Sequence, residues 1–316
     1  MPFFQPLPRT GERFAAQQLK KRGYAHDHNA YAPHRPGLHW RPAEPERQRR
    51  RPQRPRLFRR APGTSLGVLY LPATRADDFH GPADSTGKAE LKVNALAYRQ
   101  VFFSDICGTL CTPQFIVPFA DIDARLPGAA RHTGESGFGD PQVGGTLFFI
   151  NDPASRTYSG LLTLITLPVG EYHSENPDVS PGANRWGATF VYNYTQGVGE
   201  KWVLEANLEA QLYAKNDDYF GSDLKQDPLY RLQAFASYDF TASTYGALRL
   251  IHADGGELRI NDQRIDDTHK RYTQVGFEVG HWLDKQNQLM FGLSQNVATR
   301  NGYHGTDALL RLVHVF

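Results

Sequence analysis

Side chains that could do chemistry are spread through the sequence, and their spacing points to no reaction. The histidines of the last third lack the spacing of metal ligands: His252, His269, His281, His304 and His314. We therefore expect no metal site and no cofactor. No serine–histidine–acid set or pair of acids can be named that would build a hydrolytic site. The sequence names no catalytic residue, and we expect the protein not to be an enzyme.

Two cysteines and one glycine-rich segment are the remaining motifs with a chemical interpretation. Cys107 and Cys111 lie in a connection between two expected strands. They form a hairpin disulfide if their Cβ atoms approach to about 4 Å, or they stay a pair of free thiols, and both states are open. The segment 137–140 (GFGD) has the glycines of a phosphate-binding loop. Because it leads into a strand and not into a helix, we expect an ordinary turn there.

Polar side chains that alternate with apolar ones are the residues best placed to act on a solute. In residues 202–215 every second residue is apolar, which is the period of a strand and not of a helix. Residues 185–196 and 229–240 repeat the pattern. If the apolar face contacts lipid, the polar face must point inward, because an arginine at the membrane midplane costs roughly 2–4 kcal/mol. The expected lumen-lining residues are Glu205, Asn207, Glu209, Gln211, Arg231, Gln233, Arg249, Gln274, Glu278 and Arg311.

About twelve strands are needed to position these side chains. We place them at 65–73, 88–103, 112–125, 141–150, 156–168, 185–196, 201–215, 229–240, 244–257, 270–283, 288–299 and 306–316. The connections between them alternate between short and long. We expect the long ones at 74–87, 126–140, 169–184, 216–228 and 258–269, with 300–305 of intermediate length. Short turns at one rim and long loops at the other are typical of outer-membrane barrels.

Strand length and aromatic placement favour the same fold. Most of the expected strands reach the roughly 9–11 residues that a tilted strand needs to cross the hydrocarbon. Aromatic residues near strand ends fit interfacial girdles: Tyr158, Trp186, Trp202, Tyr230, Tyr238, Phe240, Tyr245 and Trp282. We predict that residues 61–316 form an all-β domain, an antiparallel up-and-down transmembrane β-barrel of about twelve strands.

The first 60 residues differ in composition from the rest of the chain. They carry a net charge of +11, against −9 for residues 61–316, and nine of the 21 prolines. Such a stretch cannot bury a core, so we expect a disordered arm that barrel assembly does not need. Its arginine cluster contains a single aromatic residue, Phe58, and lacks the repeated interleaving that stacks bases, so no nucleic-acid partner is expected. No secretory signal peptide is visible at Met1.

The chain ends on a phenylalanine preceded by apolar residues at alternate positions, over residues 310–316. This segment resembles the C-terminal signature of bacterial outer-membrane β-barrels, with His314 as a departure. The resemblance implies that Phe316 belongs to the signal read by the barrel-assembly machinery. It also implies a place in the bacterial outer membrane, in contact with outer-membrane lipid.

Four further segments resemble one family within that class. They are residues 62–70 (PGTSLGVLY), 137–141 (GFGDP), 166–172 (TLPVGEY) and 199–202 (GEKW). These segments are similar to those of the phenol-degradation MetA-pathway family of outer-membrane transporter-like proteins, over about residues 62–316. The resemblance implies a barrel that admits small, rather hydrophobic molecules.

Three functions are compatible with these patterns. The first, which we favour, is an outer-membrane channel or transporter for a small-molecule solute, hydrophobic or aromatic in character. The second is an outer-membrane enzyme, and the third is a structural or adhesion barrel without transport. Permeability of liposomes separates the first from the other two.

Overall fold

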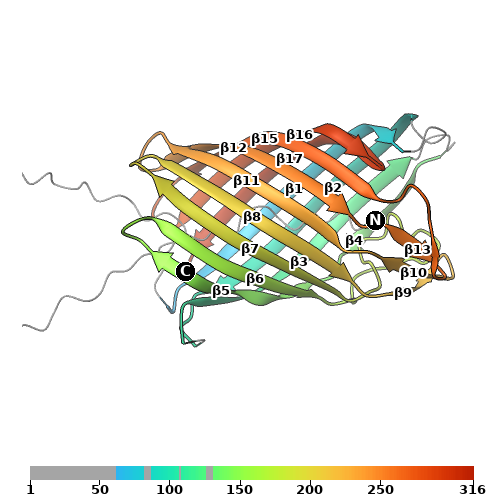
Figure 1. Ribbon diagram of the computed structural model, residues 1–316, viewed down its shortest axis with the longest axis horizontal. Coiled ribbons are helices and arrows are strands. Elements are labelled where there is room, and N and C mark those ends of the chain that lie inside the picture. The colour runs from blue at the N-terminus through green and yellow to red at the C-terminus, as the bar shows by residue number, and fades with distance from the viewer. Residues whose placement is uncertain (1–61, 82–86, 107, 126–130) are drawn as a thin grey trace, which may run out of the picture.

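Twelve antiparallel strands form the wall of a barrel in the computed structural model, which describes residues 62–81, 87–106, 108–125 and 131–316 (Figure 1). The strands are β1 (Ser65–His80), β2 (Gly87–Phe102), β3 (Cys111–Arg125), β5 (Gln142–Asp152), β6 (Thr157–Thr166), β7 (Gly187–Val198), β8 (Trp202–Tyr213), β11 (Leu229–Asp239), β12 (Thr244–Gly255), β15 (Lys270–Trp282), β16 (Asn287–Arg300) and β17 (Gly302–Val315). No helix in the described part of the chain is long and apolar enough to span a membrane.

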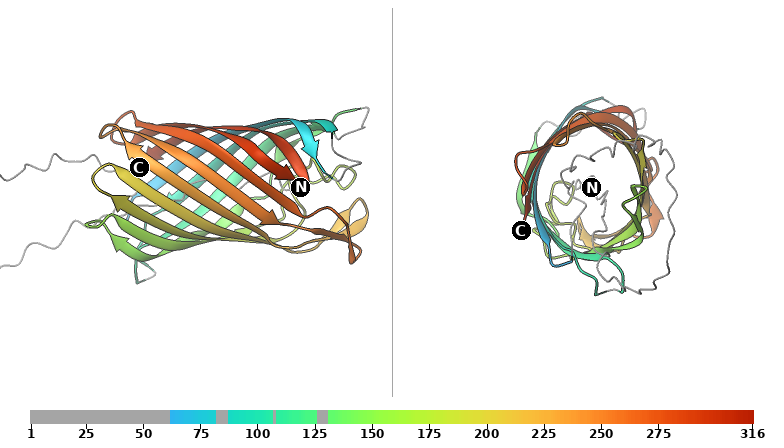
Figure 2. Two further views of the ribbon diagram at one scale, coloured as in Figure 1. Left: turned by 45° about the horizontal axis from the view of Figure 1, so that its top comes forward. Right: turned by 90° about the vertical axis from the view of Figure 1, so that its left-hand side faces the viewer.

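The ring closes where the first and last strands meet. β1 pairs with β2 on one side and with β17 on the other, from Leu66 opposite Val315 to His80 opposite Gly302. The end-on view in Figure 2 shows the closed ring. Closure pairs the edge strands of the sheet, which a membrane requires because lipid offers no hydrogen bonds to backbone groups. The predicted fold class is confirmed.

Five shorter strands lie at one end of the barrel. β4 (Thr133–Phe138) pairs with the second half of β3, while β5 pairs with the first half. A separate four-stranded sheet lies beyond the rim and contains β9 (Asn216–Tyr219), β10 (Ser222–Gln226), β13 (Leu258–Ile260) and β14 (Gln263–Arg264) (Figure 1). The connections expected as long loops at 126–140, 216–228 and 258–269 therefore contain strands. Two-residue turns with positive φ close the hairpins of the separate sheet, at residues 220–221 and 261–262.

The connections sort by length between the two rims, as the sequence predicts, with two differences. The expected loop at 74–87 is largely strand, because β1 continues to His80 and β2 begins at Gly87. The expected connection at 300–305 is a tight turn at Asn301, whose φ is 55°. In both places the strands extend past the apolar band. A strand outside the lipid needs no apolar face, so its polar sequence looks like a loop.

Burial alternates along the strands and separates an outer face from an inner one. On β8, Leu204 and Leu208 expose 47% and 57% of their surface, whereas Glu205 and Glu209 expose 8% and 4%. The outer face is therefore apolar and the inner face polar at this level of the wall. This arrangement suits a barrel surrounded by lipid.

Apolar side chains fill the interior near the short-turn rim. They come from both ends of the chain and from the strands between them: Leu66, Val68, Tyr70, Ala97, Val101, Phe103, Ile116, Phe148, Tyr158, Leu162, Leu164, Val191, Trp282, Met290, Leu309, Val313 and Val315. Tyr158 and Trp282 expose only 1% and 5%, and the Tyr245 hydroxyl donates to the inward-facing Glu278, so the expected place of these three in an outer girdle is wrong. Position near a strand end does not set the face; Tyr158 lies in phase with the inward-facing Leu162 and Leu164.

Candidate functional site: the barrel interior

The structure places the expected lumen residues on the inner side of the wall. The buried members are Glu205, Asn207, Glu209, Gln211, Arg231, Gln233, Gln274, Glu278 and Arg311. Arg249 is half-buried. Their positions follow from the alternation on β8, β11, β12, β15 and β17. Their part in the passage of a solute stays a prediction.

Glu209 is the centre of the polar network on β8 and β11. It lies directly opposite Arg231 in the strand register, and its Oε1 is 2.9 Å from Arg231 Nη2. The side-chain amides of Gln211 and Gln233 also donate to its carboxylate, at 2.6 and 3.0 Å. The Asn207 amide donates to Glu205 Oε1 at 3.0 Å. This part of the inner wall is therefore a hydrogen-bonded network centred on an ion pair.

A second polar group lies across β12, β15, β16 and β17. Gln274 Nε2 donates to Asn296 Oδ1 at 3.1 Å and to Asp307 Oδ2 at 2.6 Å. Arg311 Nη2 donates to Tyr245 Oη at 3.3 Å, and Tyr245 Oη donates to Glu278 Oε1 at 3.3 Å. Together with the Glu209 network, these contacts form a polar belt on the inner wall, and Arg311 of this belt lies opposite members of the apolar cluster on both neighbouring strands.

The remaining expected site residues lie away from this belt. Cys111 is buried at the start of β3. Cys107 lies outside the described residues, so the disulfide stays a prediction. Phe316 is 65% exposed, packs edge-on against His314 at 4.6 Å, and its N–H donates to the Ser65 carbonyl. Its role as an assembly signal also stays a prediction.

The connection between β6 and β7, residues 167–186, is fastened to the turn before β5 by Asp140. The Asp140 carboxylate accepts the backbone N–H groups of Gly170 at 2.9 Å and Ala183 at 2.7 Å. Burial raises the pKa of this carboxyl, although these hydrogen bonds act in the opposite direction. A Cβ on Gly170 would lie 2.6 Å from the carbonyl carbon of Gly139, so only glycine allows this approach. The sequence segments 137–141 and 166–172 thus meet in space.

The same connection reaches into the barrel. Val179 is 4% exposed and packs in one apolar cluster with Leu91 and Val93 of β2 and with Ala120 and Ile122 of β3. Those four side chains are buried on the inner face of the wall. The β6–β7 connection therefore occupies part of the lumen below the long-loop rim.

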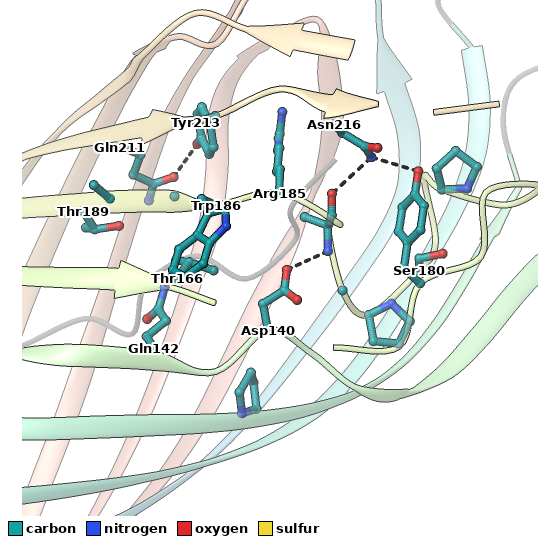
Figure 3. A pocket seen from close by; sticks show the side chains of 18 of the residues that line it. Asp140, Gln142, Thr166, Ser180, Arg185, Trp186, Thr189, Gln211, Tyr213 and Asn216 are labelled. Carbon is teal, nitrogen blue, oxygen red and sulfur yellow. Dashed lines mark hydrogen bonds between the residues drawn. The ribbon is translucent and has the colours of Figure 1, made fainter. Parts of the chain in front are cut away.

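Two cavities lie beside this connection, in the half of the barrel near the long-loop rim. The first has a volume of about 120 Å³, and its lining includes Ile116, Pro118, Tyr172, Arg185, Trp186 and Tyr213 (Figure 3). The second has a volume of about 200 Å³, and its lining includes Leu91, Val93, Lys270, Tyr272, Tyr303 and Leu309. Gln211 lines both. The cavities are thus adjacent, and both linings combine apolar and aromatic groups with many polar ones, among them Arg231 and Asp307 in the second cavity.

Arg185 is the charged side chain of the first cavity that the sequence interpretation missed. It is 6% exposed, its Nη2 donates to Gln226 Oε1 at 2.5 Å, and its guanidinium lies 4.6 Å from the centre of the Tyr213 ring. Figure 3 shows it beside Tyr213. Burial lowers the pKa of this guanidinium. The sequence contains a pattern that predicts its inward direction, because Arg185 is in phase with the inward-facing Thr189 and Asn193.

Comparisons with known proteins agree with this geometry. The chain is similar to an outer membrane channel from Pseudomonas putida F1, with 25% identity and a TM-score of 0.76 over 81% of this chain and 97% of that one. It also matches the transport unit of the autotransporter AIDA-I from Escherichia coli, at 7% identity and a TM-score of 0.50 over 81% and 90% of the two chains. At that identity the second match shows the fold alone. The comparison with curated proteins gave no match.

A family model matches most of the barrel. It covers residues 73–312 and carries the description "Putative MetA-pathway of phenol degradation". That range runs from β1 to β17 and leaves out the arginine-rich first 60 residues. The predicted class of function, an outer-membrane channel, is confirmed together with the fold. The chain therefore belongs to the phenol-degradation MetA-pathway family, as its sequence segments predict.

Proposed function

We propose that this outer-membrane channel carries small, mostly apolar solutes, with single-ring aromatic compounds as the preferred size class. The observation that carries the proposal is the pair of adjacent cavities of about 120 and 200 Å³ inside the barrel. In another protein an engineered apolar cavity of about 150 Å³ holds benzene. Apolar pockets with a few placed polar groups are the usual form of sites for small organic ligands.

The interior offers a solute two successive environments. From the long-loop rim it meets the two cavities, which share Gln211. Arg231 of the polar belt lines the second cavity, so a solute meets the belt there, and it then reaches the apolar cluster at the short-turn rim. Passage requires side chains of that cluster to move aside, because its members are buried against one another. A sugar loses more hydration in the apolar parts than an aromatic ring does, so the path favours the ring.

The outer surface supports the membrane partners of this function. Outward-facing side chains such as Leu204, Leu208 and Leu212 are 40% or more exposed. Leaving them in water is unfavourable, and outer-membrane lipid covers such a band in proteins of this fold. The C-terminal Phe316 supports recognition by the barrel-assembly machinery.

Flux measurements in asymmetric proteoliposomes test the proposal. An outer leaflet of lipopolysaccharide slows the spontaneous entry of apolar solutes, so entry through the protein can be measured. The full chain should accelerate entry of benzyl alcohol several-fold more than entry of xylose. Ala97→Trp should reduce this effect, because Ala97 is 1% exposed and lines the first cavity.

Ala206→Trp is the matched control, since Ala206 lies on the outer face of β8. It should leave the flux of benzyl alcohol unchanged. Equal acceleration of xylose and benzyl alcohol would contradict the preference for apolar solutes. A folded barrel that accelerates neither solute would favour a structural or adhesion role.

A further inference from the structure

The first cavity contains a buried cation that lies outside every ion pair of the described residues. Arg185 is 6% exposed, and it forms no ion pair with any carboxylate among the described residues. Its Nη2 donates to the neutral amide oxygen of Gln226, and its Nη1 is buried without any hydrogen-bond partner. Burying a charge is costly unless the charge is paired and its donors are satisfied. The site is therefore electrostatically incomplete.

The acid that shares this cavity with Arg185 already accepts two backbone hydrogen bonds. Asp140 lines the same cavity, but its two carboxylate oxygens accept the backbone N–H groups of Gly170 and Ala183. These bonds fasten the β6–β7 connection. Asp178, on the same connection, accepts the hydroxyl of Tyr219 at 2.6 Å. Both acids thus hold parts of the connection in place. Asp140 acts on Arg185 only through its charge at longer range, and neither acid forms an ion pair with the guanidinium.

Neighbouring side chains keep the guanidinium in position. The Tyr213 ring lies 4.6 Å from it, and the Tyr213 hydroxyl donates to Gln211 Oε1 at 2.6 Å. A guanidinium held on a ring face presents its N–H groups in a fixed plane, which is the geometry that recognises a carboxylate. Ile116, Pro118 and Trp186 supply apolar surface in the same cavity.

We infer that the first cavity binds an aromatic monocarboxylate, with the carboxylate on Arg185 and the ring against the apolar lining. The inference rests on the proposed channel function and adds a charged group to the solute that the channel takes. The cavity of about 120 Å³ suits one ring. A carboxylate satisfies the free Nη1 donor and neutralises the buried charge in one contact. A neutral ring of the same size fills the cavity but leaves the Nη1 donor without an acceptor and the charge of Arg185 without an ion-pair partner.

Equilibrium binding to the full chain in detergent tests this inference without any measurement of flux. By isothermal titration calorimetry the unmodified protein should bind benzoate at least about tenfold more tightly than benzyl alcohol, because a hydrogen bond to a charged group strengthens binding by that order. Acetate has the charge but no ring, and it should bind at least about tenfold more weakly than benzoate. Equal affinity for benzoate and benzyl alcohol, or for benzoate and acetate, would overturn the inference.

Variants assign the effect to the residue. Arg185→Gln should lower benzoate affinity about tenfold or more and change benzyl alcohol affinity less than twofold. Arg259→Gln removes the same charge from the exposed rim sheet, where Arg259 pairs with Asp227, and should change neither. Heat-modifiable gel migration reports whether each variant folds. An Arg185→Gln protein that keeps its benzoate affinity overturns the inference, and the ligand series on the unmodified protein decides the matter if that variant does not fold.

The outcomes also separate this inference from the proposed channel function. Benzoate selectivity at equilibrium without accelerated flux of benzyl alcohol would contradict the channel and keep the Arg185 site. Accelerated flux of benzyl alcohol without benzoate selectivity would keep the channel and remove the Arg185 site.

Discussion

Two arginines inside the barrel are buried to a similar degree and are partnered in different ways. Arg231 is 4% exposed and lies 2.9 Å from Glu209, its direct neighbour across the strand pair. Arg185 is 6% exposed and meets an amide and a tyrosine ring but no carboxylate, whereas each of the two arginines leaves one buried donor unused, Nη1 in Arg185 and Nε in Arg231. Burial alone therefore does not tell a structural arginine from a ligand-binding one. The difference lies in whether the protein itself supplies the counter-charge.

Breaking the ion pair between Arg231 and Glu209 should lower the stability of the barrel most. Arg231→Gln leaves Glu209 buried without a counter-charge, and the loss of one partner of a buried ion pair costs about 3–5 kcal/mol. We expect a large fall in the temperature at which the barrel loses its folded gel mobility. The double variant Glu209→Gln with Arg231→Gln removes both charges and should recover most of that loss. A double variant less stable than Arg231→Gln would show that the pair is not the source of the effect.

A charge placed on the opposite face should cost somewhat less. Leu208 adjoins Glu209 in sequence and is 57% exposed on the outside of the barrel. Leu208→Arg puts a cation into lipid, at a depth-dependent cost of about 2–4 kcal/mol near the midplane. The yield of folded barrel in lipid vesicles measures the effect, with Leu208→Ala as the control for lost apolar surface. If Leu208→Arg folds as well as the alanine variant, the outer face has been misassigned.

Weakening the hydrogen bonds by which Asp140 holds the β6–β7 connection should lower stability less, and only locally. Asp140→Asn leaves one acceptor oxygen for two backbone donors and turns an amide donor toward the other. We expect a loss of about 1–2 kcal/mol in the stability of the β6–β7 connection. Faster hydrogen exchange at the Gly170 and Ala183 amides should report it. Asp266→Asn, on an exposed loop, is the control, and similar exchange rates in both variants would contradict the anchoring role of Asp140.

Removing the unpaired cation should change stability least. Arg185→Gln loses one hydrogen bond and the contact with the Tyr213 ring, each contributing about 1 kcal/mol. It also removes a buried charge that lacks a counter-ion, which offsets the loss. We expect a net change within about 1 kcal/mol by the same gel assay. A loss as large as that of Arg231→Gln would make Arg185 a structural residue and erase the contrast between the two arginines.

The alternation of residue types allows the wall of the barrel to be predicted from sequence. Each strand in the lipid has one apolar and one polar face. The alternation along the strand therefore predicts that Leu204 points outward and Glu205 points inward. The girdle assignment failed for Tyr158, Tyr245 and Trp282 because it used distance from strand ends and ignored phase. The strand extension to His80 was missed because residues outside lipid need no alternation.

Contacts between distant segments could not be predicted in the same way. Asp140 and Gly170 are 30 residues apart, and nothing in either segment specifies that the carboxylate of one accepts the amide of the other. The sequence places Arg231 and Glu209 on the same face of the wall but does not pair them, because alternation fixes the face and not the register. Arg185 was in phase with inward residues but lies just before β7, where strand periodicity ends.

The pairing of β1 with β17 has a consequence for the order in which the barrel forms. The two strands are separated by almost the whole described chain, yet they share a register from Leu66–Val315 to His80–Gly302. Until β17 arrives, β1 has a row of backbone donors and acceptors with no partner, and lipid cannot satisfy them. Closure by the last strand is therefore the step that makes the ring compatible with a membrane. A chain that stops before Gly302 leaves two open edges, so shortening at this end should abolish insertion in an all-or-none manner, whereas a cut in the rim sheet should not.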